Sequence, residues 1–216
     1  MKAFDLLVFD WDGTLFDSTG TIVEAMQLAA ADLGLPIPSR QQASYVIGLG
    51  LKDALSHAIP AIKPEQIPQL VDRYRHHYSI KGDQISLFEG IHAMIVQLHS
   101  EGHRLAIATG KSRLGLNEAL AQSGLGGYFE GTRCADEGQP KPDPWMLHDL
   151  ADETSVPPNR MLMIGDTTHD MHLAHNAGAH FCGVTYGAHD AKSLQHPFAW
   201  RVVDSVADLT TLLIKP

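Results

Sequence analysis

Cysteine, positive charge and long apolar runs are all scarce in this sequence. Its 216 residues include only two cysteines, Cys134 and Cys182, too few for a disulfide framework. We therefore expect a reducing, cytoplasmic setting in which both thiols fill the core. No segment approaches the roughly 18 consecutive apolar residues of a membrane helix, and acids interrupt the N-terminal stretch where a secretory signal needs an apolar centre. The formal net charge of −9 argues against nucleic acid or an anionic membrane as a partner.

The remaining composition is that of a globular protein. Apolar residues make up 44% of the chain and charged residues 19%, and the length suits one well-cored domain with a smaller insertion. From residue 88 onward, strand and helix patterns alternate, which predicts an α/β fold with a doubly wound, Rossmann-like parallel sheet. Between about residues 19 and 80 the pattern is helix after helix, without a strand. We predict a core of residues 1–16 and 88–216, with an all-helical cap, residues 17–87, inserted into it.

The stretch FDLLVFDWDGTL, residues 4–15, organises the rest of the chain. It begins as the near-continuous apolar run of a buried parallel strand. It ends in two acids, Asp10 and Asp12, which would point into the crevice where open α/β sheets bind ligands. Gly13 lets the chain turn there and brings backbone N–H groups toward the site. Taken alone, such a stretch also fits a plain acidic turn after a strand. The residues at the other strand ends are therefore needed to distinguish a ligand site from such a turn.

Polar residues of the kind that phosphoryl transfer requires recur at later points of the predicted core. Thr109 and Gly110 follow the apolar strand of LAIATGKS. Lys141 lies in GQPKPDP, a loop stiffened by prolines. Asp166 follows the buried strand of MLMIGDTTHD, and Asp170 comes four residues later. Together with the first two acids they form a set of four motifs.

These four motifs, in this order, resemble those of the haloacid dehalogenase superfamily, and the resemblance covers essentially the whole chain. The predicted helical cap lies between the first and second motifs, and this position resembles that of the small helical cap in the family's phosphoglycolate phosphatase-like branch. The resemblance implies hydrolysis of a phosphomonoester through an aspartyl-phosphate intermediate. It also implies a small phosphorylated metabolite as the substrate, with phosphoglycolate as the first expectation.

The resemblance also implies roles for the acids. A phosphate dianion repels an attacking carboxylate, so the converging acids of this site require a cation, and Mg²⁺ is the expected cofactor. Asp10 would be nucleophile and metal ligand, and Asp166 a second carboxylate ligand. Asp12 would bind the metal through its backbone carbonyl. The Asp12 side chain would then be free to protonate the leaving alcohol and later to activate water.

The other motif residues would act on the phosphoryl group. Thr109 would donate a hydrogen bond to it, and Lys141 would screen the nucleophile and hold a phosphate oxygen. Backbone N–H groups at Gly13 and Gly110 would assist. Asp170 would orient Lys141 or a metal-bound water.

Two other functions remain open at this point. One is a phosphomutase of the same superfamily, similar to beta-phosphoglucomutase, and the other is a non-catalytic binding or regulatory module with the same fold. Asp12 favours hydrolysis of a C–O–P ester, because the family's dehalogenases need no acid for a halide and its phosphonate-cleaving members usually carry alanine there. The complete set of acids and lysine argues against a non-catalytic module. Both a monomer and a homodimer are compatible with the sequence.

Substrate choice would depend on the cap. The loop of Gly48, Leu49 and Gly50 resembles the specificity loop of the phosphoglycolate phosphatase-like branch, although a plain turn between helices fits equally well. Lys52, just beyond it, is either a solvated helix lysine or a contact for a substrate carboxylate or phosphate. A cap of this kind would exclude water once a ligand is bound.

The thirteen histidines do not follow the spacing of a zinc site, and we expect most of them to be ordinary, partly exposed residues. His169 is the exception to follow, because it lies between Asp166 and Asp170.

Overall fold

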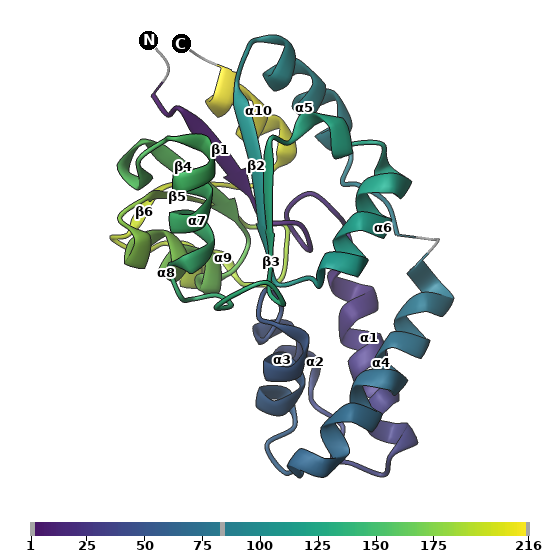
Figure 1. Ribbon diagram of the computed structural model, residues 1–216. Coiled ribbons are helices and arrows are strands. Elements are labelled where there is room, and N and C mark those ends of the chain that lie inside the picture. Colours follow the sequence, from purple (N-terminus) through teal and green to yellow (C-terminus); the bar gives the residue numbers. More distant parts are fainter. Residues whose placement is uncertain (1–2, 83–84, 215–216) are drawn as a thin grey trace.

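The computed structural model describes residues 3–82 and 85–214, so residues 1–2, 83–84 and 215–216 of the predicted core and cap lie outside it (Figure 1). Its strands form one parallel, six-stranded sheet in the order β3-β2-β1-β4-β5-β6. The strands are β1 (Leu6–Phe9), β2 (Arg104–Thr109), β3 (Gly131–Cys134), β4 (Met161–Gly165), β5 (His180–Val184) and β6 (Ala199–Val203). The predicted doubly wound parallel sheet is confirmed.

The centre of the sheet is the place where the chain reverses its direction of winding. β1 lies between β2 and β4, and all four of its residues are buried. Phe9, its last residue, pairs in register with Ile107 of β2 and Ile164 of β4. The carboxyl ends of these three strands therefore lie side by side, at the switch point where open α/β sheets bind ligands.

Helices cover both faces of the sheet (Figure 1). One face carries α5 (Ile91–Ser100), α6 (Arg113–Ser123) and α10 (Val206–Ile214). The other carries α7 (Trp145–Thr154), α8 (Thr168–Ala177) and α9 (Ala191–Leu194). Short 3₁₀ turns η2 (Gly126–Tyr128) and η3 (Pro158–Arg160), like α9, were not predicted, because three or four residues show no periodicity. Both cysteines are buried in the core, as expected.

Helices α1–α5 lie between β1 and β2, and the first four pack around a hydrophobic cluster of their own. They are α1 (Thr19–Asp32), α2 (Arg40–Tyr45), α3 (Leu51–Ala58) and α4 (Ile67–Gly82), with η1 (Pro64–Gln66) before α4. The predicted capping box opens α2, where Ser39 and Gln42 satisfy each other's backbone N–H groups. Figure 1 places this helical group apart from the helices that cover the sheet. The division at residues 17 and 87 stays a prediction. No helix of the described residues is long and apolar enough to cross a membrane.

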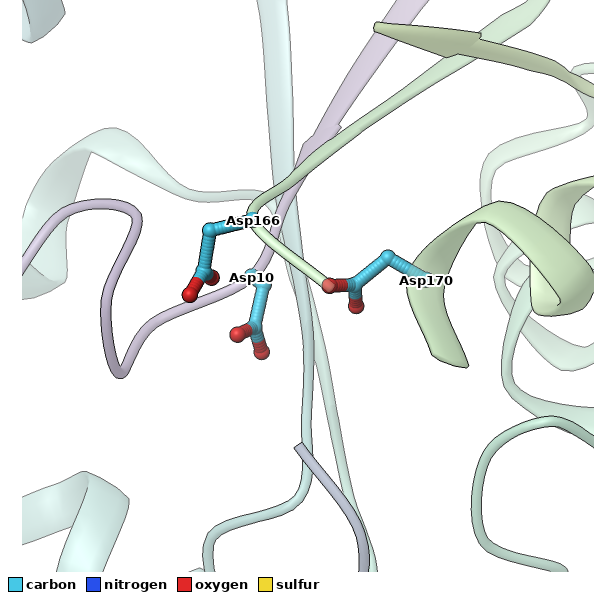
Figure 2. A group of neighbouring side chains, drawn as sticks. All are labelled: Asp10, Asp166 and Asp170. Carbon is cyan, nitrogen blue, oxygen red and sulfur yellow. The ribbon is translucent and has the colours of Figure 1, made fainter. Parts of the chain in front are cut away.

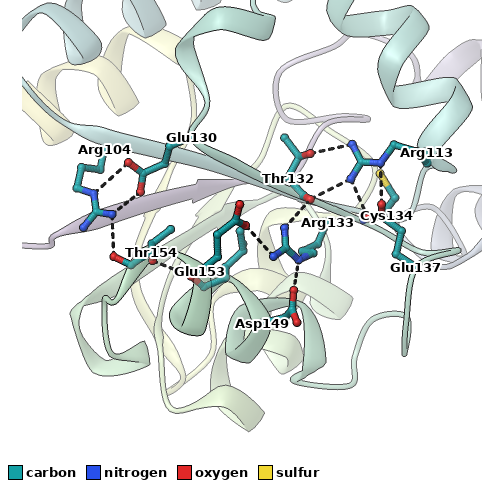
Figure 3. A network of polar contacts seen from close by, with 11 residues as sticks. Arg104, Arg113, Glu130, Thr132, Arg133, Cys134, Glu137, Asp149, Glu153 and Thr154 are labelled. Carbon is teal, nitrogen blue, oxygen red and sulfur yellow. Dashed lines mark hydrogen bonds and ion pairs between the residues drawn. The ribbon is translucent and has the colours of Figure 1, made fainter.

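Ion pairs hold the edge strand β3 to its neighbouring helices (Figure 3). Arg133 of β3 pairs with Asp149 and, at 2.7 Å, with Glu153, both on α7. Arg113 of α6 donates to the Thr132 hydroxyl at 2.8 Å. Charged groups along an edge strand disfavour pairing with another chain.

Candidate active site

Three buried carboxylates meet at the carboxyl ends of the central strands (Figure 2). Asp10 follows β1, Asp166 follows β4, and Asp170 lies in the first turn of α8. One oxygen of each lies within 4.8 Å of the others. Thr167, the N-cap of α8, fixes Asp170 by donating its hydroxyl proton to Oδ2 at 2.7 Å. The helix start thus aims this carboxylate at the other two.

Lys141 lies between two of these carboxylates. Its Nζ donates to Asp10 Oδ1 at 2.7 Å and to Asp170 Oδ1 at 2.6 Å. All three side chains are buried to within 1%. The structure therefore brings together the residues that were expected to screen the nucleophile and to orient the lysine.

One lysine does not balance three buried acids. Burial raises the pKa of Asp10 to about 7, although Lys141 opposes this shift. Burial and the nearby Asp10 and Asp170 also hold the pKa of Asp166 well above its usual range. Asp10 Oδ2 is buried and has no hydrogen-bond partner among the described residues. A buried acidic cluster with a spare oxygen fits a metal site of the kind that Mg²⁺ prefers, made of carboxylate oxygens.

The residues around Asp166 explain the need for glycine at two positions. Thr14 Oγ1 donates to Asp166 Oδ1 and the Ala188 N–H to Oδ2, both at 2.7 Å. A Cβ on Gly13 or on Gly187 would lie 2.2 Å from Oδ2. The N–H of Gly13 donates to a carbonyl within its own turn, three residues on. In the structure, then, Gly13 permits the close approach of Asp166.

Asp12 is held by two donors, neither of which the sequence predicted. Ser18 Oγ donates to Asp12 Oδ1 at 2.7 Å. Lys111 Nζ lies 3.0 Å from both carboxylate oxygens, and it also donates to the hydroxyl of Tyr78 on α4 at 3.2 Å. The Lys111 N–H donates to Thr109 Oγ1 at 3.2 Å. The available signal was the lysine two residues after the threonine of LAIATGKS, but nothing in the sequence identified its partner.

The loop predicted to choose the substrate contacts the core. A Cβ on Gly110 would lie 2.4 Å from the Gly48 carbonyl oxygen and 2.7 Å from that of Leu49. A Cβ on Gly48, whose φ is +94°, would lie 3.1 Å from Thr167 Oγ1. Gly50 precedes α3 and packs near Ala135 and Pro140, whereas Lys52 is exposed on α3. The contacts of this loop with Gly110 and α8 bring the cap onto the site.

Two histidines bind the end of α2 to the core. His169 Nε2 and His189 Nε2 both bond to the Tyr45 carbonyl oxygen, at 2.8 and 3.0 Å. The Thr168 N–H donates to His189 Nδ1 at 3.0 Å, so His189 carries its proton on Nε2 and donates to Tyr45. The Tyr45 ring also stacks on His189, with ring centroids 5.2 Å apart. His169 was singled out by its position in the sequence, whereas His189 was missed because it lies in no motif.

Comparison with known proteins supports this interpretation of the site. The family model described as haloacid dehalogenase-like hydrolase matches residues 7–184. A phosphoglycolate phosphatase of Vibrio cholerae is 30% identical over 223 residues, covering 99% of both chains. A phosphoglycolate phosphatase of Aliivibrio fischeri is 34% identical over 191 residues and 84% of both chains. The crystal structure of a hydrolase from Pseudomonas syringae superposes with a TM-score of 0.88 at 26% identity, over 97% of both chains.

Proposed function

This chain belongs to the haloacid dehalogenase-like hydrolase family, and from that premise we propose that it hydrolyses 2-phosphoglycolate with Mg²⁺ as its cofactor. The observation that carries the proposal is the buried cluster of Asp10, Asp166 and Asp170, with Lys141 between Asp10 and Asp170. The choice of substrate rests on relatives named phosphoglycolate phosphatase, which match nearly the whole chain. The reaction class rests on the residues themselves.

Asp10 would attack phosphorus as the ester oxygen leaves, so that one P–O bond forms while another breaks. Lys141 would bind a phosphoryl oxygen and neutralise part of the charge that Asp10 brings to it. Its position is held by Asp170, 2.6 Å away. Thr109, buried at the end of β2, would donate its hydroxyl proton to the phosphoryl group. Lys141 already contacts Asp10 at 2.7 Å, so this pair would need little reorganisation.

Mg²⁺ would be held by the carboxylates of Asp10 and Asp166 and by the backbone carbonyl of Asp12. When bound, it would supply the positive charge that lets a carboxylate approach a phosphate dianion. Asp10 Oδ2, which has no hydrogen-bond partner in the part of the chain that the structure describes, and the surplus of acid over lysine support this assignment.

Asp12 would transfer the protons. It would give a proton to the leaving alcohol in the first step and take one from the water that cleaves the aspartyl-phosphate in the second. Ser18 and Lys111 hold its carboxylate in one orientation. An ester needs this acid, because an alkoxide leaves poorly without a proton.

The test is phosphate release from a panel of phosphoglycolate, pyrophosphate, mononucleotides, sugar phosphates and an aryl phosphate, with Mg²⁺ present. We expect turnover of the aryl phosphate and the highest kcat/KM for phosphoglycolate. Asp10→Asn should abolish release while keeping the fold, and the exposed Asp17→Asn is the matched control. Absence of release across the panel would contradict the proposal, as would isomerisation of a hexose phosphate without free phosphate.

Metal binding has a readout that does not depend on turnover. We expect Mg²⁺ to raise the thermal midpoint of the wild-type protein, because it binds only the folded cluster. Asp166→Asn should reduce that increase. An equal increase in both proteins would show that the metal binds elsewhere.

A further inference from the structure

Two lysines serve the site, Lys141 buried and Lys111 partly buried, and their partners differ. Lys141 contacts two carboxylates, Asp10 and Asp170. Among the described residues, Lys111 contacts one carboxylate, that of Asp12, and its third acceptor is the neutral hydroxyl of Tyr78. Hydrogen bonds from an ammonium to a carboxylate are roughly twice as strong as those between neutral groups. Lys111 therefore has a neutral acceptor that a second anion can replace.

Lys111 is also a charged group held largely out of water. Its side chain is 13% exposed, and that of Asp12 is 12% exposed. Burial would lower the pKa of Lys111, but the Asp12 carboxylate outweighs it and holds the pKa above the usual range. The lysine thus stays protonated, and in surroundings of low polarity its attraction for an anion is stronger than at the surface.

The position of Lys111 determines which part of a substrate it meets. In the proposed mechanism the phosphoryl group lies on Asp10, Thr109 and Lys141, and the leaving oxygen faces Asp12. Lys111 contacts the Asp12 carboxylate, which would carry the proton for the leaving oxygen. Its Nζ also lies against the ring of Tyr78, 4.9 Å from the ring centre. Tyr78 lies on α4 of the helical insertion. Because Lys111 contacts Asp12 and the leaving oxygen would face Asp12, the group attached to that oxygen would lie near this lysine.

We propose that Lys111 binds the carboxylate of the substrate, and that it selects phosphate esters with a carboxylate one carbon from the ester oxygen. The substrate carboxylate takes the place of the Tyr78 hydroxyl as the third acceptor of the ammonium group. This inference rests on the proposed function and adds to it the residue that distinguishes phosphoglycolate from uncharged esters. It assigns to a partly buried lysine beside Asp12 the role for which the exposed Lys52 was an open candidate.

The glycine loop supports this assignment by its contacts. The carbonyl groups of Gly48 and Leu49 lie against Gly110, next to Lys111 in sequence. Carbonyl oxygens repel a carboxylate, so this loop closes the site without supplying the positive charge that a carboxylate requires. Lys111 supplies that charge.

The experiment compares two substrates in one protein. One is 2-phosphoglycolate, and the other is 2-hydroxyethyl phosphate, which has the same number of carbons but an uncharged hydroxymethyl group in place of the carboxylate. The measured quantity is the ratio of their kcat/KM values in wild type, in Lys111→Met and in the matched control Lys192→Met, whose lysine is exposed on α9. A ratio within one protein does not depend on how much of that protein is folded.

We expect the wild-type and Lys192→Met proteins to prefer the carboxylate ester. In Lys111→Met the ratio should fall about tenfold to one-hundredfold, mostly through KM for phosphoglycolate, as for the loss of a charged hydrogen bond. Equal losses on both esters would overturn the inference, because Lys111 would then only position Asp12. If the wild-type protein hydrolysed both esters without preference, the inference about Lys111 would be overturned and the proposed function would stand. If it hydrolysed neither ester nor an aryl phosphate, the proposed function would be overturned as well.

Discussion

Gly110→Ala tests whether the loop of the helical insertion must touch the core for catalysis. Gly110 follows the threonine at the end of β2, and its missing side chain leaves room for the Gly48 and Leu49 carbonyl groups. An alanine Cβ would lie 2.4 Å from the Gly48 oxygen and 2.7 Å from the Gly48 carbonyl carbon. Both are backbone atoms, so no flexible side chain can yield to the new methyl group.

The expected displacement follows from these distances. Ordinary van der Waals contact begins near 3.4 Å, so the loop backbone must retreat by about 1 Å. A displacement of about 1 Å in groups that position a substrate can cost about 100-fold in rate. The strain lies between backbone groups of the loop and the core, and no buried side chain is removed, so the free energy of unfolding should change far less than kcat/KM.

The assay is kcat/KM for phosphoglycolate together with the thermal midpoint. Gly127→Ala is the matched control, because a Cβ there meets nothing within 4 Å. We expect a loss of about 100-fold for Gly110→Ala and none for the control. If Gly110→Ala kept the wild-type kcat/KM, the active enzyme would not need the contact between Gly110 and the Gly48–Leu49 carbonyl groups, and this prediction would be wrong.

Two further substitutions test other parts of the account. Lys141→Met leaves the Asp10 and Asp170 carboxylates buried without their cation. In the presence of a chelator, this substitution should lower the free energy of unfolding, measured with urea, by about 3–5 kcal/mol. Added Mg²⁺ should restore part of the loss. An unchanged free energy of unfolding would contradict the claim that Lys141 compensates the charge of the two carboxylates. His189→Ala removes one hydrogen bond to the Tyr45 carbonyl and also removes the imidazole ring that stacks on the Tyr45 ring. It should speed amide hydrogen exchange in α2 and leave that of β1 unchanged, and equal exchange in wild type and variant would exclude a clamping role.

The fold was predictable because its main signals are local. The apolar runs of β1 and β4 mark buried strands, and the Ser39–Gln42 capping box marks the start of α2. The acids and Lys141 were predictable because each follows such a strand or lies in a proline-stiffened loop. Their convergence then follows from the parallel sheet, whose strand ends meet at one edge.

The missed residues depend on contacts between distant segments. Lys111 lies in the loop between β2 and α6, and Tyr78 lies on α4, 33 residues away, so no periodicity relates them. His189 lies in the loop after β5 and reaches Tyr45, which is 144 residues away. The role of Gly13 was only partly foreseen, because the close approach of Asp166 is a property of the folded chain.

The central claim is that Asp10 carries the phosphoryl group during turnover. The most direct measurement is mass spectrometry of enzyme quenched in acid during steady hydrolysis of phosphoglycolate with Mg²⁺. We expect one added phosphoryl group on the peptide that contains Asp10, and none in Asp10→Asn. A phosphoryl group on another residue, or steady phosphate release by Asp10→Asn, would contradict it.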